Sequence, residues 1–294
     1  MELTIIINFH NMRRQAERTL FTLSRTFQRD CADIAYNVVT IDHGSSEKLD
    51  ADRVRGAGEN VRYLYLDTDA VSPCRALNAA VEDAQSEFVL IAIDGARMFS
   101  PGVIAQCRAA ADRHDHPFAF CLNAHLGVDK QYRLAEKGHS QADEDALLAT
   151  VDWRADGYRL FDIACLGNLM AHDHGPNESN VLFLKKADFL SVGGYDPAFA
   201  SPGGGFAGID LFRRLVGSAT IDPVLLIGEA TFHQMHGGTV TETYGEPRKA
   251  RIAAMAEEYA EITGAPSKRA YYPFDRLGER HDRWRRFIER EGRR

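Results

Sequence analysis

Paired cysteines, long apolar runs and an excess of positive charge are all missing from this sequence of 294 residues. The five cysteines are scattered and no CxxC pair occurs, so the sequence indicates neither a disulfide framework nor a thiolate zinc site. No apolar run approaches the roughly 20 residues that span a bilayer. The formal net charge of −7 disfavours nucleic acid as a partner.

A leader segment is not expected either, because the chain enters the apolar strand Leu3–Ile7 almost at once. The scattered cysteines are typical of a reducing compartment. We therefore expect a cytoplasmic protein with at most a peripheral contact to a membrane surface.

Short apolar runs alternate with segments of helical spacing in the first part of the chain. Strands are expected at Leu3–Ile7, Val38–Ile41, Tyr63–Leu66, Phe88–Ile93 and Phe118–Leu122. The run Phe88–Ile93 has no polar residue, which is typical of a strand buried on both faces of a parallel sheet. This alternation predicts an α/β fold with a doubly wound, Rossmann-like and mostly parallel sheet that is flanked by helices.

The pattern is less regular beyond residue 130. We expect a helix at Gln131–Ala149, short strands within Val151–Phe161 and a loop at Ala171–Asn180. Two further short strands, Val224–Ile227 and Ala230–Phe232, follow a glycine-rich segment.

The last part of the chain is predicted to be a helical, basic extension. A helix is expected at Pro247–Ile262, and the tail Gly278–Arg294 is strongly basic. Residues 1–244 then form one domain, with a nucleotide-binding half (1–125) and an acceptor half (126–244), and residues 245–294 form the extension. The tail could lie on an anionic membrane, or it could pack Trp284 against the body as a solvated helix.

Two aspartates follow directly after apolar strands. Ligands of open α/β sheets bind at the carboxyl ends of the strands, so we expect the active site at Asp94. Asp94 could bind a ribose hydroxyl or a divalent cation, or it could be a turn residue before Gly95. Asp42 could accept hydrogen bonds from a base or a ribose, or it could cap the next helix.

Three basic or amide side chains are candidates for binding phosphate or sugar. Arg75 and Asn78 are three residues apart at a helix start, where the helix dipole favours an anion, although Arg75 could equally be a surface residue. Arg97 follows Asp94 closely and could neutralise a phosphate.

Two histidines and one further aspartate complete the candidates. His233 and His236 could converge on a metal ion if the segment turns, or one could be buried and the other exposed. Asp210, in the first turn of a helix, could be a general base, although the helix dipole favours an aspartate there in any case.

Taken together, these segments resemble the family-two glycosyltransferases of the GT-A fold over roughly Leu3–Gly238. The resemblance rests on an ordered set of motifs: the turn Asn8-Phe9-His10, IDHGSS (41–46), residues 72–96, residues 180–199, GGGFAGIDLFRRL (203–215) and FHQMHGG (232–238). It implies a donor site formed by Asn8, Asp42, Arg75, Asn78, Asp94 and Arg97.

The resemblance also implies individual roles. Asp42 would contact the base, and Arg75 and Asn78 would lie near the ribose and phosphates. Asp94 matches the first aspartate of the DxD motif. His233 or His236 would complete a site for Mn²⁺ or Mg²⁺.

The sequence departs from the family pattern at two places. The second carboxylate of the DxD motif is Ala96 here, so a metal ion would depend on Asp94 and the histidines, with Arg97 as a partial substitute. The acidic pair that usually holds the catalytic base lacks its glutamate. Asp210 is the candidate because it is the carboxylate of that segment, although matching DLFRRL instead would place the pair at Ala207-Gly208, two residues before Asp210.

The resemblance implies a glycosyltransferase, of hexosyl or N-acetylhexosaminyl type, that moves a sugar from a nucleotide-sugar donor to an acceptor hydroxyl or amine. The alternative is a catalytically inactive nucleotide- or sugar-binding protein of the same fold. A nucleotidyltransferase is disfavoured, because no glycine-rich phosphate loop with a following basic residue comes after the first strand.

Overall fold

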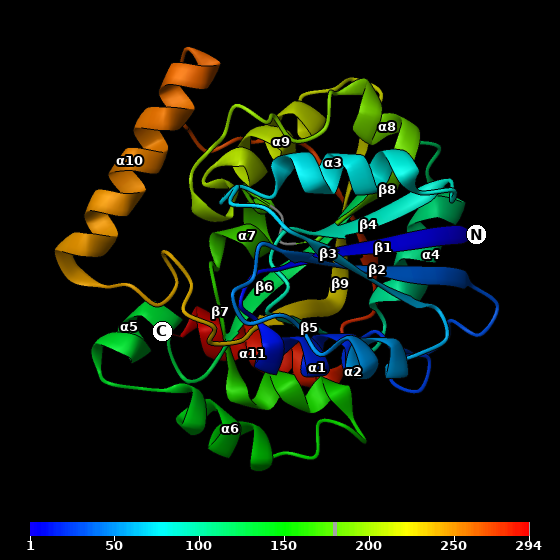
Figure 1. Ribbon diagram of the computed structural model, residues 1–294. Coiled ribbons are helices and arrows are strands. Elements are labelled where there is room, and N and C mark those ends of the chain that lie inside the picture. Colours follow the sequence, from blue (N-terminus) through cyan, green and yellow to red (C-terminus); the bar gives the residue numbers. More distant parts are fainter. Residues whose placement is uncertain (179–180, 294) are drawn as a thin grey trace.

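The computed structural model describes residues 1–178 and 181–293 (Figure 1). The strands are β1 (Glu2–Phe9), β2 (Ala35–His43), β3 (Val61–Leu66), β4 (Phe88–Ala92), β5 (Arg97–Phe99), β6 (Pro117–Leu126), β7 (Ala164–Leu166), β8 (Leu182–Lys185), β9 (Asp222–His233) and β10 (Asp275–Gly278). The α-helices are α1 (Arg13–Thr22), α2 (Ala51–Gly56), α3 (Cys74–Asp83), α4 (Val103–Arg113), α5 (Gln131–Glu136), α6 (Gln141–Ala149), α7 (Met170–His174), α8 (Lys186–Ser191), α9 (Ala207–Val216), α10 (Gly245–Thr263) and α11 (Asp282–Gly292). Two short 3₁₀ helices are η1 (Gly157–Ile163) and η2 (Pro202–Gly204).

The strands form a single mixed sheet in the order β10-β9-β6-β8-β4-β1-β2-β3. Strand β1 pairs in parallel with both β2 and β4, and β6 pairs in parallel with β9. Strand β8 is antiparallel to β4 and β6, and the short strand β5 is antiparallel to β9. The prediction of a mostly parallel sheet flanked by helices is confirmed.

Helices cover both faces of this sheet, and two hydrophobic clusters result. Along β1, Leu3, Ile5 and Ile7 belong to the cluster that includes side chains of α1, α2 and α4. Ile6, which points the other way, belongs to the cluster with α3, α8 and α9. Figure 1 shows α3 and α9 above the strands and α1 and α2 below them. This alternation with a period of two is what a strand buried on both sides requires.

Three predictions of local structure beyond residue 150 are wrong. Instead of short strands within Val151–Phe161, the chain forms η1. The loop expected at Ala171–Asn180 begins inside helix α7, and its residues 179–180 lie outside the described part. The two strands predicted between Val224 and Phe232 are one strand, β9. Gly228, with φ of +88°, lies where the β6–β9 register shifts, so the glycine marks an irregularity and not a chain break.

Two predicted boundaries also move. The helix expected at Gln131–Ala149 is divided into α5 and α6 near Gly138, whose φ is +81°. Strand β6 continues to Leu126 and not only to Leu122, so its carboxyl end carries additional polar side chains.

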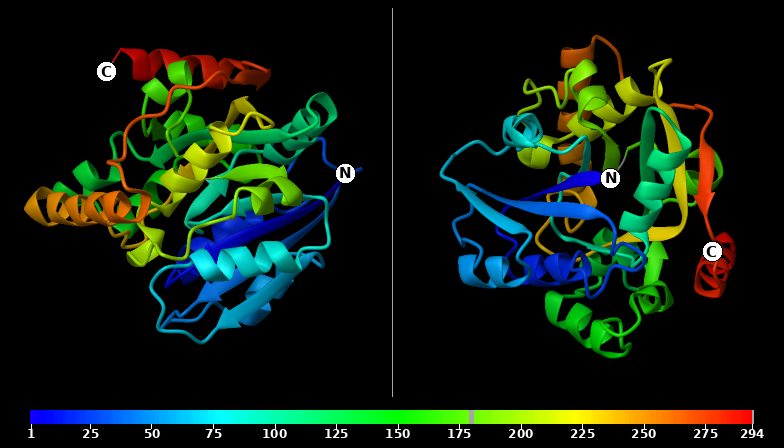
Figure 2. Two further views of the ribbon diagram at one scale, coloured as in Figure 1. Left: turned by 90° about the horizontal axis from the view of Figure 1, so that it is seen from above. Right: turned by 90° about the vertical axis from the view of Figure 1, so that its right-hand side faces the viewer.

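The C-terminal residues contribute a strand as well as helices. Strand β10 pairs in parallel with β9 at the edge of the sheet, and helix α10 projects from the body (Figure 2). On α11, the rings of Trp284 and Phe287 pack against Phe161 of η1, at centroid distances of 5.6 and 5.2 Å. The apolar side chains that a membrane would take up are therefore buried. Among the described residues, no helix is both long and apolar enough to cross a bilayer.

Candidate active site at the carboxyl end of strand β4

Asp94 follows the carboxyl end of the central strand β4, where the chain turns sharply. The turn is fixed locally: the Ala96 N–H donates to Asp94 Oδ1 at 3.0 Å, and the Thr19 hydroxyl donates to the Gly95 carbonyl at 2.7 Å. A Cβ atom at Gly95 would lie 2.3 Å from the Phe9 ring. Only glycine allows this close approach between the turn and β1.

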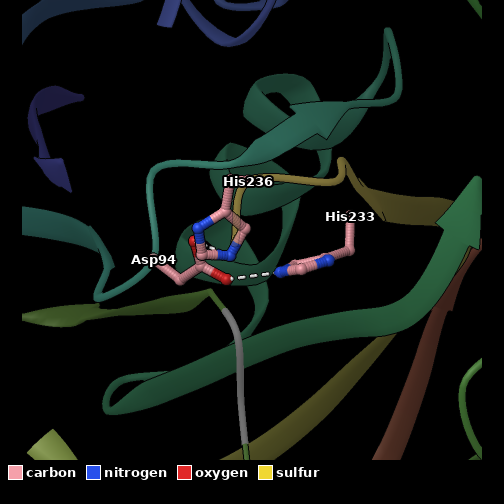
Figure 3. A group of neighbouring side chains, drawn as sticks. All are labelled: Asp94, His233 and His236. Atoms are coloured by element: carbon pink, nitrogen blue, oxygen red, sulfur yellow. Dashed lines mark hydrogen bonds and ion pairs between the residues drawn. The ribbon is translucent and has the colours of Figure 1, made fainter. Parts of the chain in front are cut away.

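The backbone of this turn holds His233 and His236 beside Asp94. The Gln234 N–H donates to the Ala96 carbonyl at 2.8 Å, which ties the segment after β9 to the turn. Figure 3 shows both imidazole rings beside the Asp94 carboxylate. His233 Nε2 lies 2.8 Å from Asp94 Oδ2, and His236 Nε2 lies 3.8 Å from Asp94 Oδ1. The His233 side chain is fully buried, whereas those of His236 and Asp94 are 12% and 22% exposed, so the cluster reaches solvent through these two.

Arg97 completes the cluster from the antiparallel strand β5, where it lies opposite His233 in the register. Its Nη2 lies 3.2 Å from Asp94 Oδ2, and its Nη1 donates to Asn123 Oδ1 at 2.5 Å. Arg97 is a buried residue, so its charge is only weakly screened by water.

Burial and charge set the protonation of the cluster. Burial would raise the pKa of the Asp94 carboxyl, but the imidazoles and Arg97 together hold it well below its usual value. Burial also lowers the pKa of the Arg97 guanidinium, although Asp94 opposes this. Burial lowers the pKa of His233 to about 3, against the attraction of Asp94. The Asp94 carboxyl is therefore ionised at neutral pH.

The donor set of this cluster fits a divalent cation. The ligand atoms of Asp94, His233 and His236 all lie within 4.8 Å of one another. Two imidazole nitrogens with one carboxylate oxygen suit a transition metal better than Mg²⁺, which prefers oxygen ligands. Arg97 adds a fixed positive charge, so an anionic group such as a phosphate can be held at the same place.

Asn8 and Asp42 lie at the carboxyl ends of β1 and β2. The Asn8 amide donates to the Ile93 carbonyl at 3.3 Å, directly before Asp94, and its Oδ1 has no hydrogen-bond partner within the described ranges. Asp42 is fully buried: its Oδ2 accepts from the Leu49 N–H and the Tyr63 hydroxyl, both at 2.8 Å. Asn8 is therefore part of the cluster's surroundings, whereas a base could reach Asp42 only if its neighbours moved. The role of Asp42 stays a prediction.

Asn78 and Asp210 have partners in the turn at Gly194 and Tyr195. The Asn78 amide donates to the Tyr195 carbonyl at 2.7 Å, and its oxygen accepts from the Tyr195 N–H at 2.9 Å. Asp210 accepts from Nε and Nη2 of Arg214, at 2.8 and 2.6 Å. Arg214 in turn donates to the Gly194 carbonyl at 2.7 Å. Through these contacts, Asn78 and Asp210 support the fold around this turn. The predicted donor-binding role of Asn78 and the predicted catalytic role of Asp210 stay predictions. Arg75 is exposed at the start of α3.

The sequence analysis missed several side chains near the cluster. Asn123 and His125 lie on β6 beyond the strand end that we expected, and the polar residues at alternating positions 123 and 125 were the available signal. Gln131, at the start of α5, contacts His233. Glu178 is an exposed residue, and the charge of Arg97 lies within electrostatic reach of its carboxyl.

Comparisons with known proteins agree with this fold. Residues 4–224 match the family described as glycosyltransferase-like family 2. No curated protein matches the chain.

Solved structures show the same fold at low sequence identity. A 1–349 fragment of S. aureus TarS in complex with UDP has a TM-score of 0.52 and 13% identity, over 88% of this chain and 66% of that chain. The same fragment with UDP-GlcNAc has a TM-score of 0.52 and 15% identity, over 88% and 67%. Glucosyl-3-phosphoglycerate synthase from Mycobacterium tuberculosis in complex with phosphoglyceric acid has a TM-score of 0.51 and 11% identity, over 93% and 87%. This chain thus spans about two thirds of the length of the TarS fragment.

Proposed function

Because this chain belongs to the glycosyltransferase-like family 2, we propose that it transfers a glycosyl group from a nucleotide-sugar donor to an acceptor hydroxyl or amine. The observation that carries the proposal is the cluster of Asp94, Arg97, His233 and His236 at the carboxyl end of β4. Ligands of open α/β sheets bind at this edge, and the cluster supplies the positive charge and metal ligands that a diphosphate requires there.

The donor that we propose is a sugar linked to a nucleoside diphosphate, transferred as a hexosyl or N-acetylhexosaminyl group. Support comes from the similar structures that hold UDP and UDP-GlcNAc. On this chain, Asn8, Asp42, Arg75, Asn78, Asp94 and Arg97 remain the proposed donor residues. Among them, Asp94 and Arg97 have the strongest support, because they form an ion pair within the cluster, and Asn8 lies next to it through its hydrogen bond to the Ile93 carbonyl.

The proposed cofactor is a divalent cation, Mn²⁺ in preference to Mg²⁺, held by Asp94, His233 and His236. When bound, the cation supplies positive charge to the diphosphate leaving group. Arg97 adds a fixed charge that needs no reorganisation as the leaving group departs, because Asn123 and Asp94 hold its guanidinium in place. The cation and Arg97 would thus stabilise the diphosphate together, although position 96 carries no second carboxylate to bind the cation.

The general base of an inverting reaction would be a carboxylate that removes the acceptor proton. We propose Asp210, and we add Glu178 because Asp210 already accepts two hydrogen bonds from Arg214. The variants Asp210→Asn and Glu178→Gln decide between them. Loss of the base lowers kcat by about 10²–10⁴-fold without lowering donor affinity.

A panel of nucleoside diphosphates and nucleotide sugars, with and without Mn²⁺, tests the proposal. A ligand of the native state raises the thermal midpoint, and Asp94→Ala is expected to abolish this rise. The same panel is then assayed for release of the nucleoside diphosphate in the presence of sugar acceptors. An unchanged midpoint rise in Asp94→Ala would remove Asp94 from the site. Donor binding with no turnover on any acceptor would favour the inactive binding protein instead.

The acceptor is proposed only by class, as a hydroxyl or amine. A peripheral membrane contact of the C-terminal helix also remains a proposal. It would have to use the arginines of α11, because Trp284 and Phe287 are buried.

A further inference from the structure

Gln131 makes two contacts with the same histidine. It is fully buried at the start of α5, and its Nε2 donates to the His233 carbonyl at 2.9 Å. Its Oε1 is hydrogen-bonded to Nδ1 of the His233 ring and lies 3.3 Å from Nδ1 of His125. One amide therefore holds both the backbone and the ring of His233.

These contacts fix the orientation of the amide. Exchanging its oxygen and nitrogen would place Oε1 against the His233 carbonyl oxygen, two acceptors facing each other. With Nε2 at the carbonyl, the atom that faces the His233 ring is an oxygen, which can only accept. His233 Nδ1 must then carry a hydrogen, and His125 Nδ1 can donate to the second lone pair of the same oxygen.

This tautomer has a consequence on the other side of the ring. In a neutral imidazole with a hydrogen on Nδ1, Nε2 carries a lone pair. That lone pair points at Asp94 Oδ2 from 2.8 Å, and Oδ2 is an acceptor as well. A second proton on the ring would put a charge on a fully buried side chain, beside the Arg97 guanidinium, whose Nη2 already lies 3.2 Å from the same Oδ2. A divalent cation satisfies both lone pairs at once.

We propose that Gln131 is a positioning residue that holds His233 in its Nδ1–H tautomer, so that Nε2 and Asp94 are left to share a divalent cation. The inference deepens the proposed function, because it concerns the metal site of that same centre. It depends on hydrogen-bond geometry around the ring and not on any donor or acceptor substrate.

The backbone between the two histidines is held independently. The fully buried Glu144 carboxylate accepts from the Met235 N–H at 2.7 Å, and the Gln15 amide donates to the Met235 carbonyl at 2.5 Å. Arg14, which is paired with Glu144 at 3.2 Å, also reaches that carbonyl at 3.4 Å. The segment carrying His233 and His236 is thus fixed from its own backbone, and Gln131 adds the ring orientation that the backbone alone does not determine.

Titration of Mn²⁺ into the nucleotide-free protein tests the proposal without any enzymatic assay. Gln131→Leu removes the acceptor for the Nδ1 hydrogen, and we expect about 10–100-fold weaker Mn²⁺ binding. Gln131→Glu keeps an acceptor oxygen and is expected to recover most of the loss. His125→Leu is the matched control: it removes the other hydrogen bond to the same oxygen and should leave Mn²⁺ affinity within about threefold of wild type.

The tautomer is measured directly by the ¹⁵N chemical shifts of His233 in metal-free wild-type protein, which does not depend on the folding of any variant. We expect a protonated Nδ1 and an unprotonated Nε2. A hydrogen on Nε2 with a bare Nδ1 would overturn the proposal. So would wild-type affinity for Mn²⁺ in a folded Gln131→Leu, or absence of Mn²⁺ binding in the wild type. If these measurements agree with expectation but no nucleotide sugar is turned over, the proposed function fails and the inference about Gln131 stands.

Discussion

The residues next to Asp94 are fixed by close packing as well as by hydrogen bonds. The position of Asp94 depends on its two neighbours. Gly95 has no side chain to clash with the Phe9 ring, and the backbone of Ala96 forms hydrogen bonds with both Asp94 and Gln234. Ala96 is itself fully buried, at the place where the family pattern has a second carboxylate. The departure from the DxD motif therefore coincides with a turn packed into the core.

Gly95→Ala is expected to destabilise the protein by about 1–3 kcal/mol, because its Cβ would lie 2.3 Å from the Phe9 ring and 2.7 Å from the Asn8 carbonyl oxygen. Denaturant unfolding measures the change. Gly208→Ala, in helix α9 with nothing within 4 Å of the added Cβ, is the control and should be neutral or stabilising by up to about 1 kcal/mol. Equal losses in the two variants would contradict the packing argument.

At the scale of elements, α3 and α9 hold one glycine turn between them. Asn78 of α3 binds both backbone groups of Tyr195, and the Asp210–Arg214 pair of α9 reaches the carbonyls of Val192 and Gly194. This turn belongs to the glycine-rich segment of residues 193–208. In the structure, its described contacts at this turn join two helices.

A double-mutant cycle on Asp210 and Arg214 tests this connection. Asp210→Asn and Arg214→Gln should each lower the free energy of unfolding, and their combination should cost less than the sum by about 0.5–3 kcal/mol, because both remove the same contact. Denaturant unfolding gives all four values. Strict additivity, together with a loss of turnover confined to Asp210→Asn, would instead favour Asp210 as the base.

Strand β9 contains a buried acid beside its irregular glycine. Glu229 accepts from the Tyr158 hydroxyl at 2.8 Å and from the Gly102 N–H at 3.0 Å, and burial raises the pKa of its carboxyl from 4.5 to about 7. Between these two values the native state keeps a proton that the unfolded chain releases, so this residue's contribution to stability falls as pH rises.

Comparing the free energy of unfolding of wild type with that of Glu229→Gln isolates the pH dependence that Glu229 contributes. From pH 4 to pH 8, the free energy of unfolding of wild type relative to the variant should fall by up to roughly 3 kcal/mol. Thermal or denaturant unfolding across the pH range provides the check. A difference that is flat with pH, or that rises, would show that Glu229 is ionised in the native state well below pH 7.

At the scale of the whole molecule, the C-terminal residues are joined to the central sheet. Strand β10 extends it beyond β9, and His281 donates to the Gly228 carbonyl at 2.9 Å, next to the irregularity in β9. Helix α11 then covers η1 with Trp284 and Phe287. The segment expected to be a helical extension thus shares the core of residues that precede it.

Trp284→Ala should therefore destabilise the whole protein by about 3–5 kcal/mol, the usual cost of removing a large buried aromatic side chain. The exposed Arg286 on the same helix is the control, and Arg286→Ala should change stability by less than about 0.5 kcal/mol. Calorimetry is expected to give one cooperative transition for both variants. A separate early transition in Trp284→Ala, with the main one unmoved, would contradict a shared core.

The sequence by itself determined the sheet and where its chemistry lies. Uninterrupted apolar runs such as Phe88–Ile93 can be stable only when both faces are covered, so strand, burial and the place of Asp94 followed from local composition. The ordered motifs likewise identified the family, which the match over residues 4–224 confirms. Local patterns failed at η1, a 3₁₀ helix that packs against α11, and at β9, where pairing with β6 continues past the irregular Gly228.

Only the tertiary structure decided which polar side chains share the site with Asp94. Strands β5, β6 and β9 meet at one edge, and their pairing places Arg97, Asn123 and His233 together although they are far apart in sequence. It also turned Asn78 and Asp210 toward a glycine turn and placed Gln131 against His233. A side chain's partner depends on register and on helix packing, which are long-range properties, and spacing along the chain does not encode them.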